Sequence, residues 1–157
     1  MKTLHTVLFF LLIVIGCTSK HAASSEEDFR ITFSSKSYLT RNDISITVTR
    51  GELHLRNATA GQAQPVEQTY KLRQAEDASE ILTYLRSIDF LKMEQPAAER
   101  LRDAPDVRIT ASYDGSTRSI DLGKTPRLPD TLVRLRSMIL SLASKYNPGW
   151  LKEAGLE

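Results

Sequence analysis

The feature that most constrains the fold is a pair of alternating segments joined by Arg50-Gly51. Apolar residues occupy every second position on both sides of these two residues, which is the pattern of strands with one buried face. A two-residue turn at Arg50-Gly51 places Val48 opposite Leu53. It also places Ile46 opposite Leu55, so all four apolar side chains share one face. Because a slip of one residue would turn them to the other face, the sequence predicts this register.

Four further segments carry the strand pattern, two of them joined by a hairpin turn. Residues 29–33 alternate apolar and polar side chains, and residues 66–72 do so less regularly. Asp114-Gly115 is a strong signal for a two-residue hairpin turn, because both residues tolerate positive φ angles. A turn there places Ile109 opposite Ile120, again apolar against apolar. The sequence therefore predicts about six strands.

Two segments have apolar residues at helical spacing. The first is expected to begin at Asp77, which with Glu80 three residues later resembles a capping box, and to end near Phe90. The second is expected to begin at Pro129-Asp130 and to end before Asn147. The apolar stripes are Ala78, Ile81, Leu82, Leu85 and Ile88 in the first helix, and Leu128, Leu132, Leu135, Ile139, Leu142 and Tyr146 in the second.

The order of these elements is four strands, a helix, a hairpin and a second helix. Each helix has one apolar face, and so does each hairpin. The simplest packing that buries all these faces is an α+β fold, with an antiparallel sheet of about six strands covered on one face by two helices. The other face of the sheet would stay polar. Residues 29–157 are long enough for a single domain of this kind.

The N-terminus has the layout of a secretory signal peptide. Lys2 supplies the positive charge, and Val7–Ile15 is an unbroken apolar run of nine residues, followed by Gly16 and Cys17. A membrane-spanning helix needs about 20 apolar residues, so this run is too short to remain as an anchor. The sequence therefore predicts an exported protein.

Val14-Ile15-Gly16-Cys17 resembles the lipobox of bacterial lipoproteins. The resemblance implies that the thiol of Cys17 receives a diacylglyceryl group, that residues 1–16 are removed by cleavage between Gly16 and Cys17, and that the new amino group is acylated by a fatty acid such as palmitate. The expected location is the cell envelope, held to the membrane by lipid. Thr18 stands where an Asp favours retention in the inner membrane, so the outer membrane is favoured if the source is Gram-negative.

Residues 17–28 form the expected lipidated tether between anchor and domain. They are polar and small, without apolar periodicity, and cannot bury enough surface to offset the entropy of ordering them. His21 lies in this segment, so a role as a metal ligand is not expected.

The folded part resembles a family of small exported bacterial domains of unknown function, many of which are lipoproteins. The family has no known activity, so the resemblance implies no catalytic residues. Members often carry a cysteine pair between the first two strands, where this chain has Ser35-Lys36-Ser37. The matching pieces are Phe29–Phe33, a strand-turn-strand with Gly51, Ile88-Asp89-Phe90, Asp106 leading a strand into Tyr113-Asp114-Gly115, and Pro126 or Pro129 before the last helix.

Composition excludes several classes of function. Lys and Arg number 21 against 19 Asp and Glu, so the near-balanced charge gives no support to nucleic-acid binding. One cysteine excludes an internal disulfide, and no cysteine or histidine cluster suggests a metal site. No cofactor motif is present. His54 lies between Leu53 and Leu55, which predicts a surface imidazole on the polar face without a partner for acid–base work.

Two functions remain open at this stage. In the first, the protein is a tethered module that binds an envelope protein or polymer through the polar sheet face, or through loops at residues 34–42 and 57–65. In the second, it is a periplasmic or cell-surface hydrolase whose site is not visible in the sequence. The available carboxylates are explained by turns and strand starts, so no catalytic residue is predicted. These carboxylates are Asp103, Asp106, Asp114 and Asp121.

Overall fold

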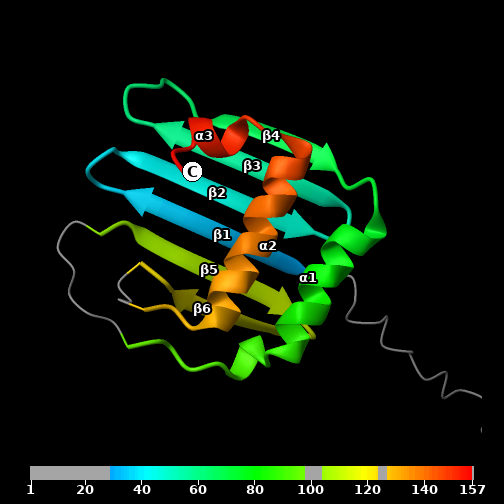
Figure 1. Ribbon diagram of the computed structural model, residues 1–157. Coiled ribbons are helices and arrows are strands. Elements are labelled where there is room, and N and C mark those ends of the chain that lie inside the picture. The colour runs from blue at the N-terminus through cyan, green and yellow to red at the C-terminus, as the bar shows by residue number, and fades with distance from the viewer. Residues whose placement is uncertain (1–28, 98–103, 124–126, 157) are drawn as a thin grey trace, which may run out of the picture.

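The protein folds as one antiparallel sheet covered by helices, as a computed structural model of residues 29–97, 104–123 and 127–156 shows (Figure 1). The strand order is β4-β3-β2-β1-β5-β6. The predicted α+β class is confirmed. The strands are β1 (Arg30–Ser37), β2 (Asn42–Thr49), β3 (Glu52–Thr59), β4 (Val66–Lys71), β5 (Asp106–Tyr113) and β6 (Ser116–Asp121). The helices are α1 (Ala75–Ser87), the 3₁₀ helix η2 (Phe90–Lys92), α2 (Asp130–Tyr146) and α3 (Trp150–Glu153).

The strand register follows the apolar alternation. Val48 pairs with Leu53 and Ile46 with Leu55, as predicted from the turn at Arg50-Gly51. Across the second hairpin Ile109 pairs with Ile120. The turn between them has positive φ angles at Asp114 (50°) and Gly115 (71°), as a two-residue hairpin turn requires. β1 lies in the centre of the sheet, between β2 and β5.

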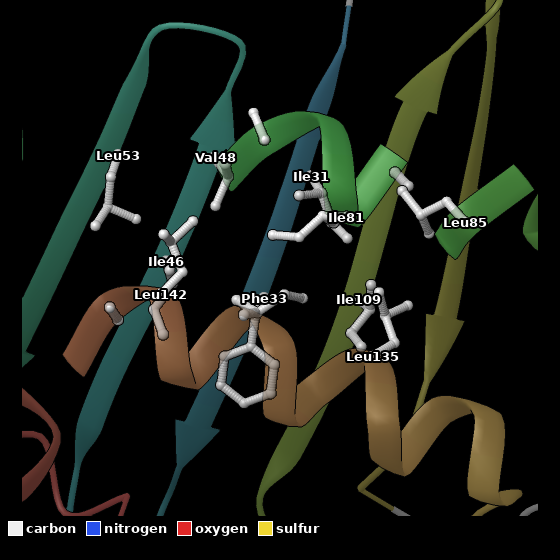
Figure 2. Packing of buried hydrophobic residues seen from close by; sticks show 14 of the residues in the cluster. Ile31, Phe33, Ile46, Val48, Leu53, Ile81, Leu85, Ile109, Leu135 and Leu142 are labelled. Carbon is white, nitrogen blue, oxygen red and sulfur yellow. The ribbon is translucent and has the colours of Figure 1, made fainter. Parts of the chain in front are cut away.

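The core lies between the sheet and the helices on one of its faces. Figure 2 shows Ile31, Phe33 and Ile109 directed from the sheet toward the helices, and Leu135 and Leu142 directed from α2 toward the sheet. Each of these side chains is at most 6% exposed. Burying one such side chain contributes about 1.5–3 kcal/mol, so this layer is the main source of stability. α2 crosses the sheet diagonally, and α1 packs at the end where β1 begins (Figure 1).

The start of α1 differs from the prediction. The helix begins at Ala75, and Gln74 precedes it without a side-chain cap, so Asp77 and Glu80 do not form a capping box. The carboxylate of Asp77 instead accepts hydrogen bonds from Lys145 (2.7 Å) and from the hydroxyl of Tyr146 (3.0 Å). These partners come from the last turn of α2, which local sequence spacing does not reveal.

The last residues return to the sheet as a short third helix, α3. Trp150 is 1% exposed and Leu151 is also buried. The side-chain amide of Asn57 on β3 donates a hydrogen bond to the carbonyl of Glu153 (3.4 Å). The C-terminal segment therefore covers the end of the sheet at which β3 ends and β4 begins (Figure 1).

Candidate binding site at the hairpin end

The predicted lipidation and cleavage residues, Cys17 and Gly16, lie outside the described residues. The same holds for the tether, for His21 and for Asp103. The described chain starts at Phe29, which is buried, and enters β1 at Arg30. None of the helices in the described ranges has the length and apolar character needed to span a bilayer.

The remaining carboxylates of interest each have a side-chain partner. Asp114 lies 2.6 Å from Arg86, and Asp121 lies 2.6 Å from Arg108. The hydrogen bond from Arg108 to Asp121 raises the pKa of the guanidinium. Asp106 accepts a hydrogen bond from the hydroxyl of Tyr38 (3.1 Å). Within the part of the chain that the structure describes, no group of three or more His, Cys, Asp or Glu side chains could hold a metal ion.

His54 lies on the polar face, as predicted, but it has two partners that the sequence reasoning missed. Its Nδ1 lies 2.9 Å from the hydroxyl of Thr69, and its Nε2 lies 3.1 Å from a carboxylate oxygen of Glu52. Glu52 could have been found, because residues two apart on a strand share a face. The His54 and Glu52 side chains are 43% and 46% exposed on an open sheet surface. This arrangement is a surface hydrogen-bond chain and not a shielded catalytic site.

The polar face carries a row of side chains that crosses all six strands. The row consists of Thr69, His54, Thr47, Thr32, Thr110 and Ser119. Its members bond to one another, with Thr32 and Thr47 hydroxyls 3.1 Å apart and those of Thr110 and Ser119 2.8 Å apart. No helix of the described residues covers this face (Figure 1). Because its hydroxyls are already paired, a partner gains little by bonding to them.

The two loops that were predicted as the other binding surface are shorter in the structure than expected. Residues 34–37 belong to β1 and residues 57–59 to β3, so the loops shrink to residues 38–41 and 60–65. Residues 34–36 belong to the sheet because they pair on both sides, with β2 and with β5, and Ser37 pairs with Asn42 of β2. The two loops lie side by side, since the N–H of Ala60 donates to the carbonyl of Arg41 (3.2 Å).

We call the end of the sheet that holds both loops the hairpin end. Two large apolar side chains are exposed there, Tyr38 at 65% and Leu39 at 72%. The ammonium of Lys36 lies 5.5 Å from the centroid of the Tyr38 ring. Together with the hydrogen bond from Tyr38 to Asp106, this contact holds the turn over β5. Of these residues, tyrosine belongs to a type that is enriched at protein interfaces and among the residues that contribute most to binding.

The described residues form a small α+β domain with two exposed large apolar side chains, Tyr38 and Leu39, at the hairpin end. A scan against protein-family models found no match for the chain. A search of curated proteins also found no matching sequence.

Proposed function

We propose that this protein is a bacterial lipoprotein in which lipid on Cys17 holds a binding module in the cell envelope. The observation that carries the proposal is the coincidence of three signals at one residue. The apolar run Val7–Ile15 ends there, the lipobox-like residues Val14 to Cys17 end there, and the polar tether begins there. Each buried CH₂ of an acyl chain contributes about 0.8 kcal/mol, so two or three chains anchor a soluble domain firmly.

The geometry of β1 supports a partner away from the lipid attachment point. The chain enters β1 at Arg30, and Tyr38 follows the far end of the same strand. A strand of this length spans roughly 26 Å at 3.3 Å per residue. The tether adds up to about 40 Å when extended. Tyr38 and Leu39 can therefore contact an envelope protein or polymer at a distance from the membrane, and their apolar character favours a protein.

Lipidation is tested in live cells that express the full-length chain. An inhibitor of the lipoprotein signal peptidase should leave residues 1–16 attached, because cleavage depends on the modified cysteine. The variant Cys17→Ser should carry no lipid and should retain residues 1–16, because it lacks the thiol that accepts the diacylglyceryl group. Unchanged mobility with the inhibitor would contradict the proposal.

Binding through the hairpin end is tested by site-specific photocrosslinking in the intact envelope. A photoreactive residue at Leu39 should capture a discrete partner, and a Tyr38→Ser change in the same chain should abolish that product. Val133 on α2, an apolar residue that is 46% exposed, is the matched control site and should capture nothing specific. Equal products from both sites would show that the hairpin end is not the contact.

A further inference from the structure

The two outermost strands of the sheet, β4 and β6, differ in how their outer edges are covered (Figure 1). At β6, the side-chain amide of Gln95 donates to the carbonyl of Asp121 (2.8 Å) and accepts from its N–H (3.0 Å), as a neighbouring strand would. Among the described residues, none forms a hydrogen bond of this kind with the outer edge of β4. An uncovered edge strand offers a row of N–H and C=O groups to another strand.

Every second residue of β4 directs its backbone N–H and C=O away from β3. The N–H of Leu72 donates to the carbonyl of Gly51 (2.9 Å), and these two residues continue the register of β3 and β4. Because hydrogen-bonded and non-hydrogen-bonded pairs alternate along antiparallel strands, the even-numbered residues of β4 bond to β3. The odd-numbered residues, Glu67, Thr69 and Lys71, therefore carry the outward groups.

These three residues are complementary to a second copy of themselves. When two β4 strands pair antiparallel with Thr69 opposite Thr69, Glu67 of each copy lies opposite Lys71 of the other. Among the antiparallel registers of these three residues, this one alone places opposite charges against each other, and the two-fold symmetry repeats the pair. All three side chains are exposed. Glu67 lies 3.5 Å from Arg56 of its own chain but is still 66% exposed, so it can accept a second cation.

The same register also covers an exposed apolar side chain. Val66 is 46% exposed at the start of β4. In the paired strands it lies opposite Leu72 of the second copy, which is partly buried against the core of its own chain. The contact therefore combines backbone hydrogen bonds, two ion pairs and the burial of Val66.

We propose that two copies of this chain pair through β4 and join their six-stranded sheets into one continuous sheet. The two-fold axis passes between the Thr69 residues and runs perpendicular to the sheet, so the polar faces of both copies lie on the same side. The proposal goes beyond the lipid anchor and the hairpin contact, and it depends on neither.

Thr69→Cys in the purified full chain tests the contact. The two Cα atoms at the axis would lie about 5.5 Å apart, a separation that a disulfide can bridge. Mild oxidation should link two copies through the introduced thiols, as mass spectrometry of the linked peptide would show. Ser119→Cys is the matched control, because Ser119 lies in the same polar row on β6, and it should stay unlinked. No link through the introduced thiol, or an equal link from Ser119→Cys, would overturn the proposal.

Charge reversal in the Thr69→Cys chain separates this register from chance collisions. Lys71→Glu should slow the formation of the link roughly tenfold, because carboxylates then face each other at both ends of the contact. Adding Glu67→Lys reverses both charges and should restore the rate. If Lys71→Glu does not fold, Glu67→Lys alone provides the second variant, because it sets two ammonium groups against each other. A rate that single reversal leaves unchanged, or that double reversal does not restore, would refute the pairing.

Discussion

At Gly123 the chain passes so close to the start of β5 that a side chain has no room. A β-carbon at this position would lie 2.0 Å from the carbonyl oxygen of Pro105 and 2.7 Å from the backbone nitrogen of Val107. The approach is held by hydrogen bonds from the N–H groups of Leu122 (2.7 Å) and Gly123 (3.2 Å) to the carbonyl of Val107. The contact is with backbone, which cannot rotate away.

We expect Gly123→Ala to destabilise the fold by about 1–3 kcal/mol, because the strand ends must move apart. Gly51→Ala is the matched control, since no atom outside its immediate neighbours lies within 4 Å of a β-carbon there and its φ is not in the left-handed region. Urea unfolding of the two variants measures the difference. Equal decreases in the free energy of unfolding would show that the close backbone approach at Gly123 does not require glycine.

Tyr113 introduces a pH dependence in the alkaline range. The ring is 4% exposed, and burial raises the pKa of its phenol above the usual value. The folded state therefore holds this proton more tightly than the unfolded state does. The resulting stability is complete below about pH 10, the pKa of an unperturbed tyrosine, and is lost as pH rises through the folded pKa.

Tyr113→Phe should accordingly lose less stability than wild type between pH 8 and pH 11. At neutral pH the variant should stay close to wild type, since the hydrogen bond from the hydroxyl to the carbonyl of Leu85 is long, at 3.4 Å. Urea midpoints at both pH values provide the measurement. Parallel pH profiles for the two proteins would contradict burial as the cause.

At the scale of elements, hydrogen bonds connect the N-terminus of α1 to the C-terminus of α2. Lys145 donates to Asp77, and this hydrogen bond raises the pKa of the ammonium. The hydroxyl of Tyr146 donates to Asp77 (3.0 Å) and accepts from the N–H of Arg73 (2.6 Å). Opposite charges at these two helix ends also suit the helix dipoles.

Tyr146→Phe should cost about 1 kcal/mol, because it removes both hydrogen bonds and keeps the ring. Tyr38→Phe is the control, since its hydroxyl makes one exposed hydrogen bond at the hairpin end and should contribute little. Thermal unfolding of the two variants gives the comparison. If Tyr38→Phe lowers the stability as much as Tyr146→Phe does, the hydrogen bonds of Tyr146 do not stabilise the contact between the two helices.

Elements whose signals are local could be predicted from the sequence. The turns at Arg50-Gly51 and Asp114-Gly115 set the register because the apolar pattern and the turn length agree. The start of α1 was misplaced because Asp77 binds residues of α2, far along the chain. Val66 has the alternation of a buried strand residue but is 46% exposed, because β4 is an edge strand.

At the scale of the whole molecule, the sheet order could not be predicted. β5 joins β1 and not its nearest preceding strand β4, and that choice depends on packing between distant segments. The loops of the hairpin end were recognised as candidate binding segments, although their bounds were too wide. The cavity lined by Ser35, Asn42, Arg136 and Leu156 could not be predicted from the sequence, because β1, β2, α2 and the C-terminal tail each contribute one part of it. No single stretch of sequence carries that signal.

Strand β1 connects the two parts of the proposed function, the lipid attachment and the exposed turn. The strand begins at Arg30, and the exposed turn follows its other end (Figure 1). If Cys17 carries lipid as proposed, the exposed turn lies at the end of β1 away from the attachment point. The proposed location in the cell envelope depends on the attachment of lipid to the thiol of Cys17.

Mass spectrometry of the amino-terminal peptide, purified from membranes of the producing cells, tests that claim most directly. We expect a chain that begins at Cys17, with diacylglyceryl in thioether linkage to its sulfur and an acyl group on its amino nitrogen. A peptide that retains residues before Cys17, or that carries a free thiol, would contradict it.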